Sequence, residues 1–343
     1  MSDPTTVLFA VLDAFPHDQV SKDLTPTLWS LAQEGGWSRE GGRAVLAAST
    51  YPNHATFITG AEPSEHRIFT NRAFHSGTLR PAQEVGPQSS TLFEECRAAG
   101  RKSLGVFGDQ NLVGVCGAVQ ADDHWPPGGV LPDGAPRGEL GYGADRAVVE
   151  AIDGMDRAEA QFVFIQLDEM DTVRHLRGPF GDAVLEQGRS TDAALGEIFE
   201  RFRDRWKQTL VIVVSDHDQE AVDPGAVDLS AEVAARGLNV QVDQEGTSAL
   251  VVGEVTEARL LDLSGVEGTS SLASGFHLVW GSPGQQFGVD WGLAAQHGSP
   301  RTTNQLAMVG GGHPGAQKIA RQIESARPSA LGWADQVRSL LSL

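Results

Sequence analysis

Four short segments of the chain are apolar at nearly every position, instead of alternating between apolar and polar residues. They are Val7–Leu12, Ser103–Phe107, Phe162–Leu167 and Leu210–Val214. Continuous apolar runs of this length are typical of strands buried on both faces, as in a parallel sheet. A further apolar segment, Leu306–Val309, predicts one last core strand near the end of the chain.

Helical patterns lie between these strands. The segment 25–36 begins with threonine and proline and ends at glycine, as a helix does. Ser90–Ala99 and Gly188–Lys207 repeat apolar residues at helical spacing, and Ala316–Leu343 predicts closing helices. The alternation of strand and helix predicts a doubly wound α/β fold, with a mostly parallel sheet sandwiched by helices.

The pattern changes between about Asp223 and Trp291. Short alternating segments appear there, at Leu238–Val242, Ser248–Val252 and His277–Trp280, with one helical stretch near 255–263. Alternation is typical of strands that have one face in the core and the other in solvent. We therefore predict a small β-rich subdomain over 223–290, inserted into a core formed by 1–222 and 291–343.

The charge of the chain limits its partners. Its 343 residues include 45 acidic residues against 26 lysines and arginines, a formal net charge of −19. This excess argues against a nucleic acid polymer or an anionic membrane as a partner. An anionic substrate would need a local positive charge, which bound metal ions can supply. Cys96 and Cys116 are too few for a disulfide framework.

The N-terminal segment has no basic region, and its apolar run Val7–Leu12 is shorter than the core of a signal peptide. No stretch approaches the 18 or more apolar residues of a membrane span. We expect a soluble, cytoplasmic protein without a membrane partner. The sequence does not indicate its oligomeric state.

Acidic and histidine residues follow three of the predicted core strands. They are Asp13 after the first strand, Asp168 to His175 after the strand 162–167, and Asp216-His217 after the strand 210–214. Ligands of open α/β sheets bind beyond the carboxyl ends of the strands, so these side chains should gather at one edge. One aspartate alone would more often cap a helix. A set of carboxylates and imidazoles suits zinc or a similar ion.

A second feature is the segment from Ala48 to Gly60. In it, Thr50-Tyr-Pro-Asn precedes an apolar helical run that ends in glycine. This order predicts a loop that leads into a helix, with the Thr50 hydroxyl at the helix N-terminus. The positive local field there favours a developing alkoxide and binds phosphate. The alternative is that Thr50 is an ordinary N-cap residue.

Together these segments resemble the alkaline phosphatase superfamily. Within it they are most similar to the nucleotide pyrophosphatase/phosphodiesterase branch, which also includes phosphonoacetate hydrolase. The matching segments are Thr50-Tyr-Pro-Asn with Asn71, Asp171-Thr-Val-Arg-His175, Ser215-Asp216-His217 and His297-Gly-Ser-Pro, spread from Val7 to about Gly312 in the family's order. The resemblance implies an alkaline-phosphatase-like fold.

The resemblance also implies two divalent metal ions, zinc first, with manganese or iron as alternatives. One ion would be held by Asp13, Thr50, Asp216 and His217, and the other by Asp171, His175 and His297. Thr50 would attack phosphorus and form a phospho-threonine intermediate, while Asn71 would hold a phosphoryl oxygen. His313 is the alternative to His297, because it follows the last core strand whereas His297 precedes it.

The chain departs from the family beside these motifs. Ala14, Arg67 and Asp218 stand where the family usually has glycine. The departures spare every residue implied as a ligand, so they bear on the fit of the substrate more than on metal binding.

We therefore predict a hydrolase of small anionic phosphodiesters or nucleotide anhydrides. One alternative is a carbon–phosphorus hydrolase of the phosphonoacetate type. Another is a phosphomonoesterase, for which Arg67 or Arg72 would supply an extra positive charge. A non-catalytic binding protein would be expected to have lost a ligand or the nucleophile, and a sulfatase would carry cysteine at position 50.

Overall fold

A central sheet of seven strands carries the fold of the computed structural model, which describes residues 5–343. Its strand order is β2 (Gly36–Trp37), β17 (Ala307–Gly310), β9 (Thr209–Val214), β1 (Thr6–Leu12), β8 (Phe162–Leu167), β6 (Ser103–Phe107) and β7 (Asp123–Trp125). The five strands from β9 to β7 run parallel, whereas β17 is antiparallel to both β9 and β2. The predicted fold class is confirmed.

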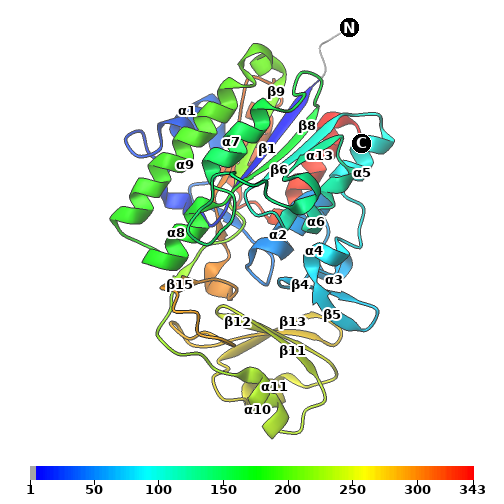
Figure 1. Ribbon diagram of the computed structural model, residues 1–343, viewed down its shortest axis with the longest axis vertical. Helices are drawn as coiled ribbons and strands as arrows, with labels where there is room; N and C mark the ends of the chain where they lie inside the picture. Colours follow the sequence, from blue (N-terminus) through cyan, green and yellow to red (C-terminus); the bar gives the residue numbers. More distant parts are fainter. Residues whose placement is uncertain (1–4) are drawn as a thin grey trace.

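The continuous apolar runs reflect burial on both faces of this sheet. In β1, Val7, Phe9 and Val11 face one hydrophobic core, and the residues between them face another. Helices cover both faces (Figure 1). The first core includes α2 (Thr50–Thr59), α5 (Leu92–Ala98), α6 (Leu112–Val115), α12 (Ala316–Ser325) and α13 (Trp333–Leu341); the second includes α1 (Pro26–Glu34), α7 (Asp145–Asp153), α8 (Glu169–Arg177) and α9 (Asp182–Glu200).

A second, antiparallel sheet lies beyond one end of the core (Figure 1). It consists of β11 (Gln241–Glu245), β12 (Ser248–Val252), β14 (Phe276–Trp280) and β13 (Gly268–Ala273), with α10 (Leu229–Ala235) and α11 (Glu257–Leu261). The chain enters and leaves it through a two-stranded stem, β10 (Glu220–Ala221) and β15 (Ala295–Gln296). The domain boundaries at 223 and 290 stay a prediction.

The hairpin of β4 (Arg72–His75) and β5 (Thr78–Pro81) belongs spatially with this second sheet, although it lies far away in the sequence. Phe69, just before β4, stacks on Phe276 with ring centroids 4.6 Å apart. Strand β12 is consequently buried on both faces. The prediction that one of its faces lies in solvent is therefore wrong.

Other differences concern element ends. The helix expected over 188–207 begins earlier, at Asp182, and ends at Glu200, where a short 3-10 helix Arg203–Gln208 follows. The strand expected over 238–242 lies at β11, and β13 was missed because its small polar residues carry little strand signal. Other short elements include β3 (Gly42–Arg43), β16 (Asn304–Gln305), α3 (Pro63–His66) and α4 (Ala82–Val85). Across residues 5–343, no helix combines the length and apolarity needed to cross a membrane.

Candidate active site

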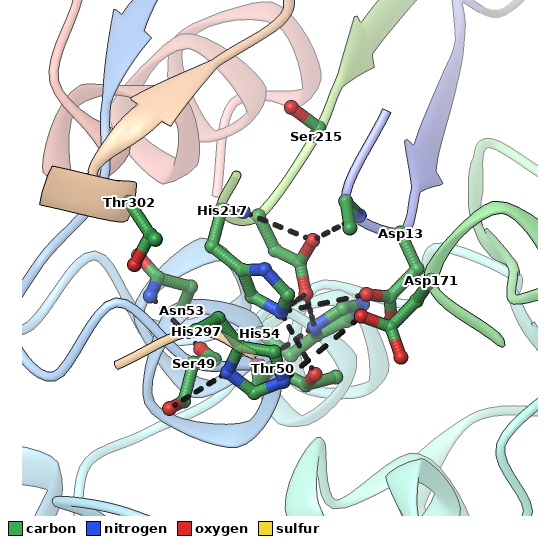
Figure 2. Close-up of polar contacts among 12 residues, drawn as sticks. Asp13, Ser49, Thr50, Asn53, His54, Asp171, Ser215, His217, His297 and Thr302 are labelled. Atoms are coloured by element: carbon green, nitrogen blue, oxygen red, sulfur yellow. Dashed lines mark hydrogen bonds and ion pairs between the residues drawn. The ribbon is translucent and has the colours of Figure 1, made fainter. Parts of the chain in front are cut away.

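The carboxyl edge of the parallel strands gathers the predicted site residues. Asp13 follows β1, Asp171 and His175 lie on α8 after β8, and Asp216 and His217 follow β9. All five are buried, and Figure 2 shows that the side chains of Asp13, Asp171 and His217 converge with those of Thr50 and His297. Three short sequence segments therefore meet because parallel strands end at the same edge.

One group of side chains surrounds Asp216. The Nε2 atom of His217 lies 3.5 Å from the Oδ1 atom of Asp13 and 3.5 Å from the Oδ2 atom of Asp216. The same nitrogen lies 3.1 Å from the Thr50 hydroxyl. These are the four residues predicted to hold the first ion.

A second group surrounds Asp171. The Nε2 atom of His175 lies 3.1 Å from one carboxylate oxygen of Asp171, and the Nε2 atom of His297 lies 3.9 Å from the other. The Nδ1 atom of His175 lies 2.8 Å from the carbonyl oxygen of Ala295, and the Nδ1 atom of His297 lies 3.3 Å from the Ser49 hydroxyl. With Nδ1 held in this way, Nε2 of each ring is directed at the carboxylate.

The two groups share a border at His217. Its ring stacks on that of His297, with centroids 4.0 Å apart, and donor atoms of Asp171, His217 and His297 all lie within 4.8 Å of one another. His217 therefore faces both groups, whereas the prediction placed it in the first group alone.

The residues fit metal ions for an electrostatic reason. The Oδ1 atom of Asp13 and the Oδ2 atom of Asp216 are buried and have no hydrogen-bond partner among the described residues. Burial raises the pKa of Asp13, and the neighbouring Asp216 and Asp171 raise it further. Burial and His217 lower the pKa of His297, which keeps the imidazole neutral and able to bind a cation. Divalent cations between the groups would compensate these carboxylates.

Thr50 is the first residue of α2, and the N-cap residue is Ser49. The alternative of Thr50 as an ordinary N-cap is therefore wrong, and its hydroxyl is directed at His217 instead. Asn53 holds the preceding loop, because its side chain accepts a hydrogen bond from the backbone N–H of Val45 and donates one to the Ser49 carbonyl. The Thr50 hydroxyl therefore projects from a loop whose backbone is held by hydrogen bonds to Asn53.

His54 is a site residue that the sequence analysis did not select. It is fully buried, and its Nδ1 atom lies 2.9 Å from the Thr50 carbonyl oxygen and 3.4 Å from the Oδ2 atom of Asp216. Its spacing in the sequence could have identified it, because a residue four positions after Thr50 lies on the same face of the helix.

The direction of β17 places His297, and not His313, beside the other predicted site residues. Because β17 is antiparallel to β9, the residues before it lie at the carboxyl edge of the parallel strands and those after it lie at the opposite edge. His297 is accordingly next to Asp171, while the backbone of His313 bonds to Thr209 at the start of β9. The expectation that a site residue should follow its strand does not apply to β17, because this strand runs in the opposite direction.

We expect His297→Ala to lower the metal content of the purified protein from two ions per chain toward one, because it removes a nitrogen beside Asp171. The matched variant His313→Ala should keep both ions. Metal analysis of the two proteins measures this directly. The reverse result would place the second site at the other end of the sheet.

A cavity of about 700 Å³ opens beside the two groups and is lined by both Thr50 and Asn71. Its far wall comes from β11 of the inserted sheet. Glu245 accepts a hydrogen bond of 2.8 Å from the backbone N–H of Asn71, and Asp243 accepts one of 2.5 Å from the Thr70 hydroxyl. Burial, and then the nearby Asp243, raise the pKa of Glu245 to about 8.

The cavity also contains two acidic residues that the sequence analysis did not select as site residues, although it named Asp168 among those that follow the strand 162–167. Asp109 follows β6 after a single glycine, so a fourth core strand delivers a carboxylate to this edge. Burial raises its pKa to about 6. Asp168, at the start of α8, also lines the cavity, and burial together with Asp171 raises its pKa. Position after a buried strand was the available signal for both.

The two candidate arginines differ in position. Arg67 has a φ of 66° and lies over the rings of Phe69, Phe74 and Phe276, 4.6–5.4 Å from their centroids. It is therefore committed to an aromatic cluster outside the cavity. Arg72 does line the cavity, and its Nε atom lies 3.2 Å from Asp243.

The fold and the site together define an alkaline-phosphatase-like α/β protein. The sequence profile described as type I phosphodiesterase / nucleotide pyrophosphatase matches residues 7–262, and the chain belongs to this family. The predicted membership is confirmed.

Curated relatives are distant in sequence. An uncharacterised pyrophosphatase/phosphodiesterase of Schizosaccharomyces pombe is 27% identical over 230 residues, which cover 62% of this chain and 44% of the relative. Ectonucleotide pyrophosphatase/phosphodiesterase family member 3 of Mus musculus is 26% identical over 234 residues, or 64% of this chain and 26% of the relative. The matched region thus spans less than half the length of these relatives.

Solved structures share the fold. Murine ectonucleotide pyrophosphatase/phosphodiesterase 5, solved as an inactive variant in complex with AMP, has a TM-score of 0.72 at 13% identity and covers 99% of this chain and 96% of its own. Phosphonoacetate hydrolase from Sinorhizobium meliloti in complex with phosphonoacetate also has a TM-score of 0.72, at 14% identity, covering 98% of this chain and 96% of its own.

Proposed function

We propose that this protein is a metal-dependent hydrolase of phosphodiesters or nucleotide anhydrides with Thr50 as its nucleophile. The observation that carries the proposal is the place of the Thr50 hydroxyl. It lies at the N-terminus of α2, 3.1 Å from Nε2 of His217, where the two carboxylate–imidazole groups meet. Membership in the phosphodiesterase family supports the same reaction class.

Asp13, Asp216 and His217 would hold one divalent ion together with Thr50, and the Asp171 group would hold the other. Their oxygen and nitrogen donors favour zinc, with manganese or iron as alternatives. When bound, the two ions lower the pKa of the Thr50 hydroxyl and offset the negative charge of the phosphoryl group.

The threonine oxygen then forms a bond to phosphorus as the bond from phosphorus to the leaving oxygen breaks. The leaving alkoxide takes up a proton, and the phospho-threonine is hydrolysed by water to restore the hydroxyl. Asn71 would hold a phosphoryl oxygen through its amide. The bond from its backbone to Glu245 fixes the position of that loop.

The charges around the cavity favour a diester over a monoester or phosphonoacetate. Of the described lining residues, Arg72 is the one arginine or lysine, and it is paired with Asp243. Asp109, Asp168 and Glu245 line the same walls and supply no positive charge. A diester monoanion carries one negative charge, whereas a monoester dianion carries two and a phosphonate with a carboxylate carries at least two, so the diester needs the least positive charge from the protein.

The test is the ratio of kcat/KM for bis-p-nitrophenyl phosphate to that for p-nitrophenyl phosphate, with the same metal and pH. We expect a ratio above ten. Arg67→Ala serves as the matched control for Arg72→Ala, because Arg67 lies outside the cavity. A ratio below one that rises in Arg72→Ala would identify a monoesterase, and rapid cleavage of phosphonoacetate alone would identify a carbon–phosphorus hydrolase.

A further inference from the structure

Arg174 has a fully buried side chain, 1% exposed, directly before His175 on α8. We propose that Arg174 is a positioning residue that fixes the three ligand-bearing segments relative to one another. This inference rests on the proposed two-metal site. Arg174 has no place in the chemistry itself, because it acts on the backbone and side chains behind the ligands.

The guanidinium group connects the ends of three neighbouring strands. It is carried by α8, which follows β8. It donates to the carbonyl oxygen of Ala14, which follows β1, and to the Asp218 carboxylate at 2.5 Å and the Gln219 carbonyl oxygen at 3.3 Å, both after β9. One planar, permanently charged group therefore spans all three segments.

Each of these contacts is one step from a predicted ligand. The backbone N–H of Ala14 donates to the Oδ1 atom of Asp216 at 3.1 Å. The Gln219 side chain donates to the Oδ1 atom of Asp171 at 2.5 Å. The Nδ1 atom of His217 lies 3.2 Å from the carbonyl oxygen of Asp218, which leaves Nε2 directed at Thr50. Outer contacts of this kind orient metal ligands.

Arg174 also stabilises an unusual backbone conformation at Ala14, which it contacts together with Asp218. Ala14 has a φ of 50°, a conformation that favours glycine and persists in other residues only when the surroundings hold it. Arg174 donates a hydrogen bond to the carbonyl oxygen of Ala14, and the backbone N–H of Ala14 donates one to Asp216. These two bonds hold the backbone of Ala14 in this conformation.

The test compares Arg174→Met with Arg338→Met. Arg338 is a partly buried arginine on α13 that pairs with Glu95 at 2.8 Å and makes no contact with the site, so its loss controls for general destabilisation. Zn²⁺ affinity is measured by competition with a chelator, and ligand geometry by the absorption spectrum of the Co²⁺-loaded protein. We expect Arg174→Met to lose about 10- to 100-fold in Zn²⁺ affinity and to change the Co²⁺ spectrum, with a fall in kcat. Arg338→Met should keep the Zn²⁺ affinity, the Co²⁺ spectrum and the kcat of the wild type.

Asp218→Asn is a second, milder variant in case Arg174→Met does not fold. It keeps an acceptor oxygen for Arg174 and removes the charge, so the Zn²⁺ affinity should fall by less than in Arg174→Met but by more than in Arg338→Met. Wild-type Zn²⁺ affinity and Co²⁺ spectrum in Asp218→Asn, or in a folded Arg174→Met, would overturn the inference. A wild-type protein that binds no Zn²⁺ would instead overturn the proposed two-metal site.

Discussion

Thr50→Ala is expected to lower kcat for a phosphodiester roughly a thousandfold or more, while two metal ions stay bound. The substitution removes the attacking oxygen, but only one of the donors around His217, because Asp13 and Asp216 remain. Thr50→Ser should keep part of the activity, since it retains the hydroxyl. The measurements are kcat with bis-p-nitrophenyl phosphate and the metal content of each purified variant.

Thr59→Ala is the matched control, because Thr59 lies at the other end of the same helix. Its hydroxyl donates to the carbonyl oxygen of Ala55 at 2.6 Å, away from the site. The control should keep the kcat of the wild type. Near wild-type turnover by Thr50→Ala would mean that water attacks the substrate directly and that no phospho-threonine forms.

Metal removal is expected to abolish activity and to lower the melting temperature. If the metal concentration is about a hundred times the Kd of each site, each bound ion adds about 2.7 kcal/mol to the free energy of unfolding. Chelation removes both contributions. The apo-protein also retains Asp13, Asp171 and Asp216 as adjacent buried carboxylates. Melting curves with and without chelator at constant pH, followed by addition of Zn²⁺, measure the effect.

Asp13→Asn separates charge repulsion from a general loss of structure. Burial and Asp216 raise the pKa of Asp13 in the folded protein, so its ionisation opposes folding when no cation is present. In chelator, Asp13→Asn should therefore melt at a higher temperature than the wild type, although it binds metal less well. An apo-protein that is active and as stable as the metal-loaded form would contradict the two-metal proposal.

The sequence alone predicted four of the five parallel strands and several residues that the structure brings together at one edge. Residues buried on both faces of a sheet must be apolar at every position, so β1, β6, β8 and β9 were visible as continuous runs. Since parallel strands end at one edge, the residues that follow those runs could be brought together without any knowledge of the helices. Asp13, Asp171 and Asp216 were predicted to lie close together in this way, and the structure places them so.

The resemblance had implied His297, but only the tertiary structure shows how it and other residues reach this edge without following a parallel strand. The choice between His297 and His313 depends on the antiparallel direction of β17, and strand direction leaves no local trace in the sequence. Glu245 bonds to Asn71 and Asp243 bonds to Thr70, across sequence separations of 174 and 173 residues. Their places are set by long-range packing, because the aromatic cluster around Phe276 docks the hairpin β4–β5 on the inserted sheet. Local sequence patterns indicate which residues are buried and whether a segment is a helix or a strand. They do not indicate which segments that are distant in the sequence pack against each other.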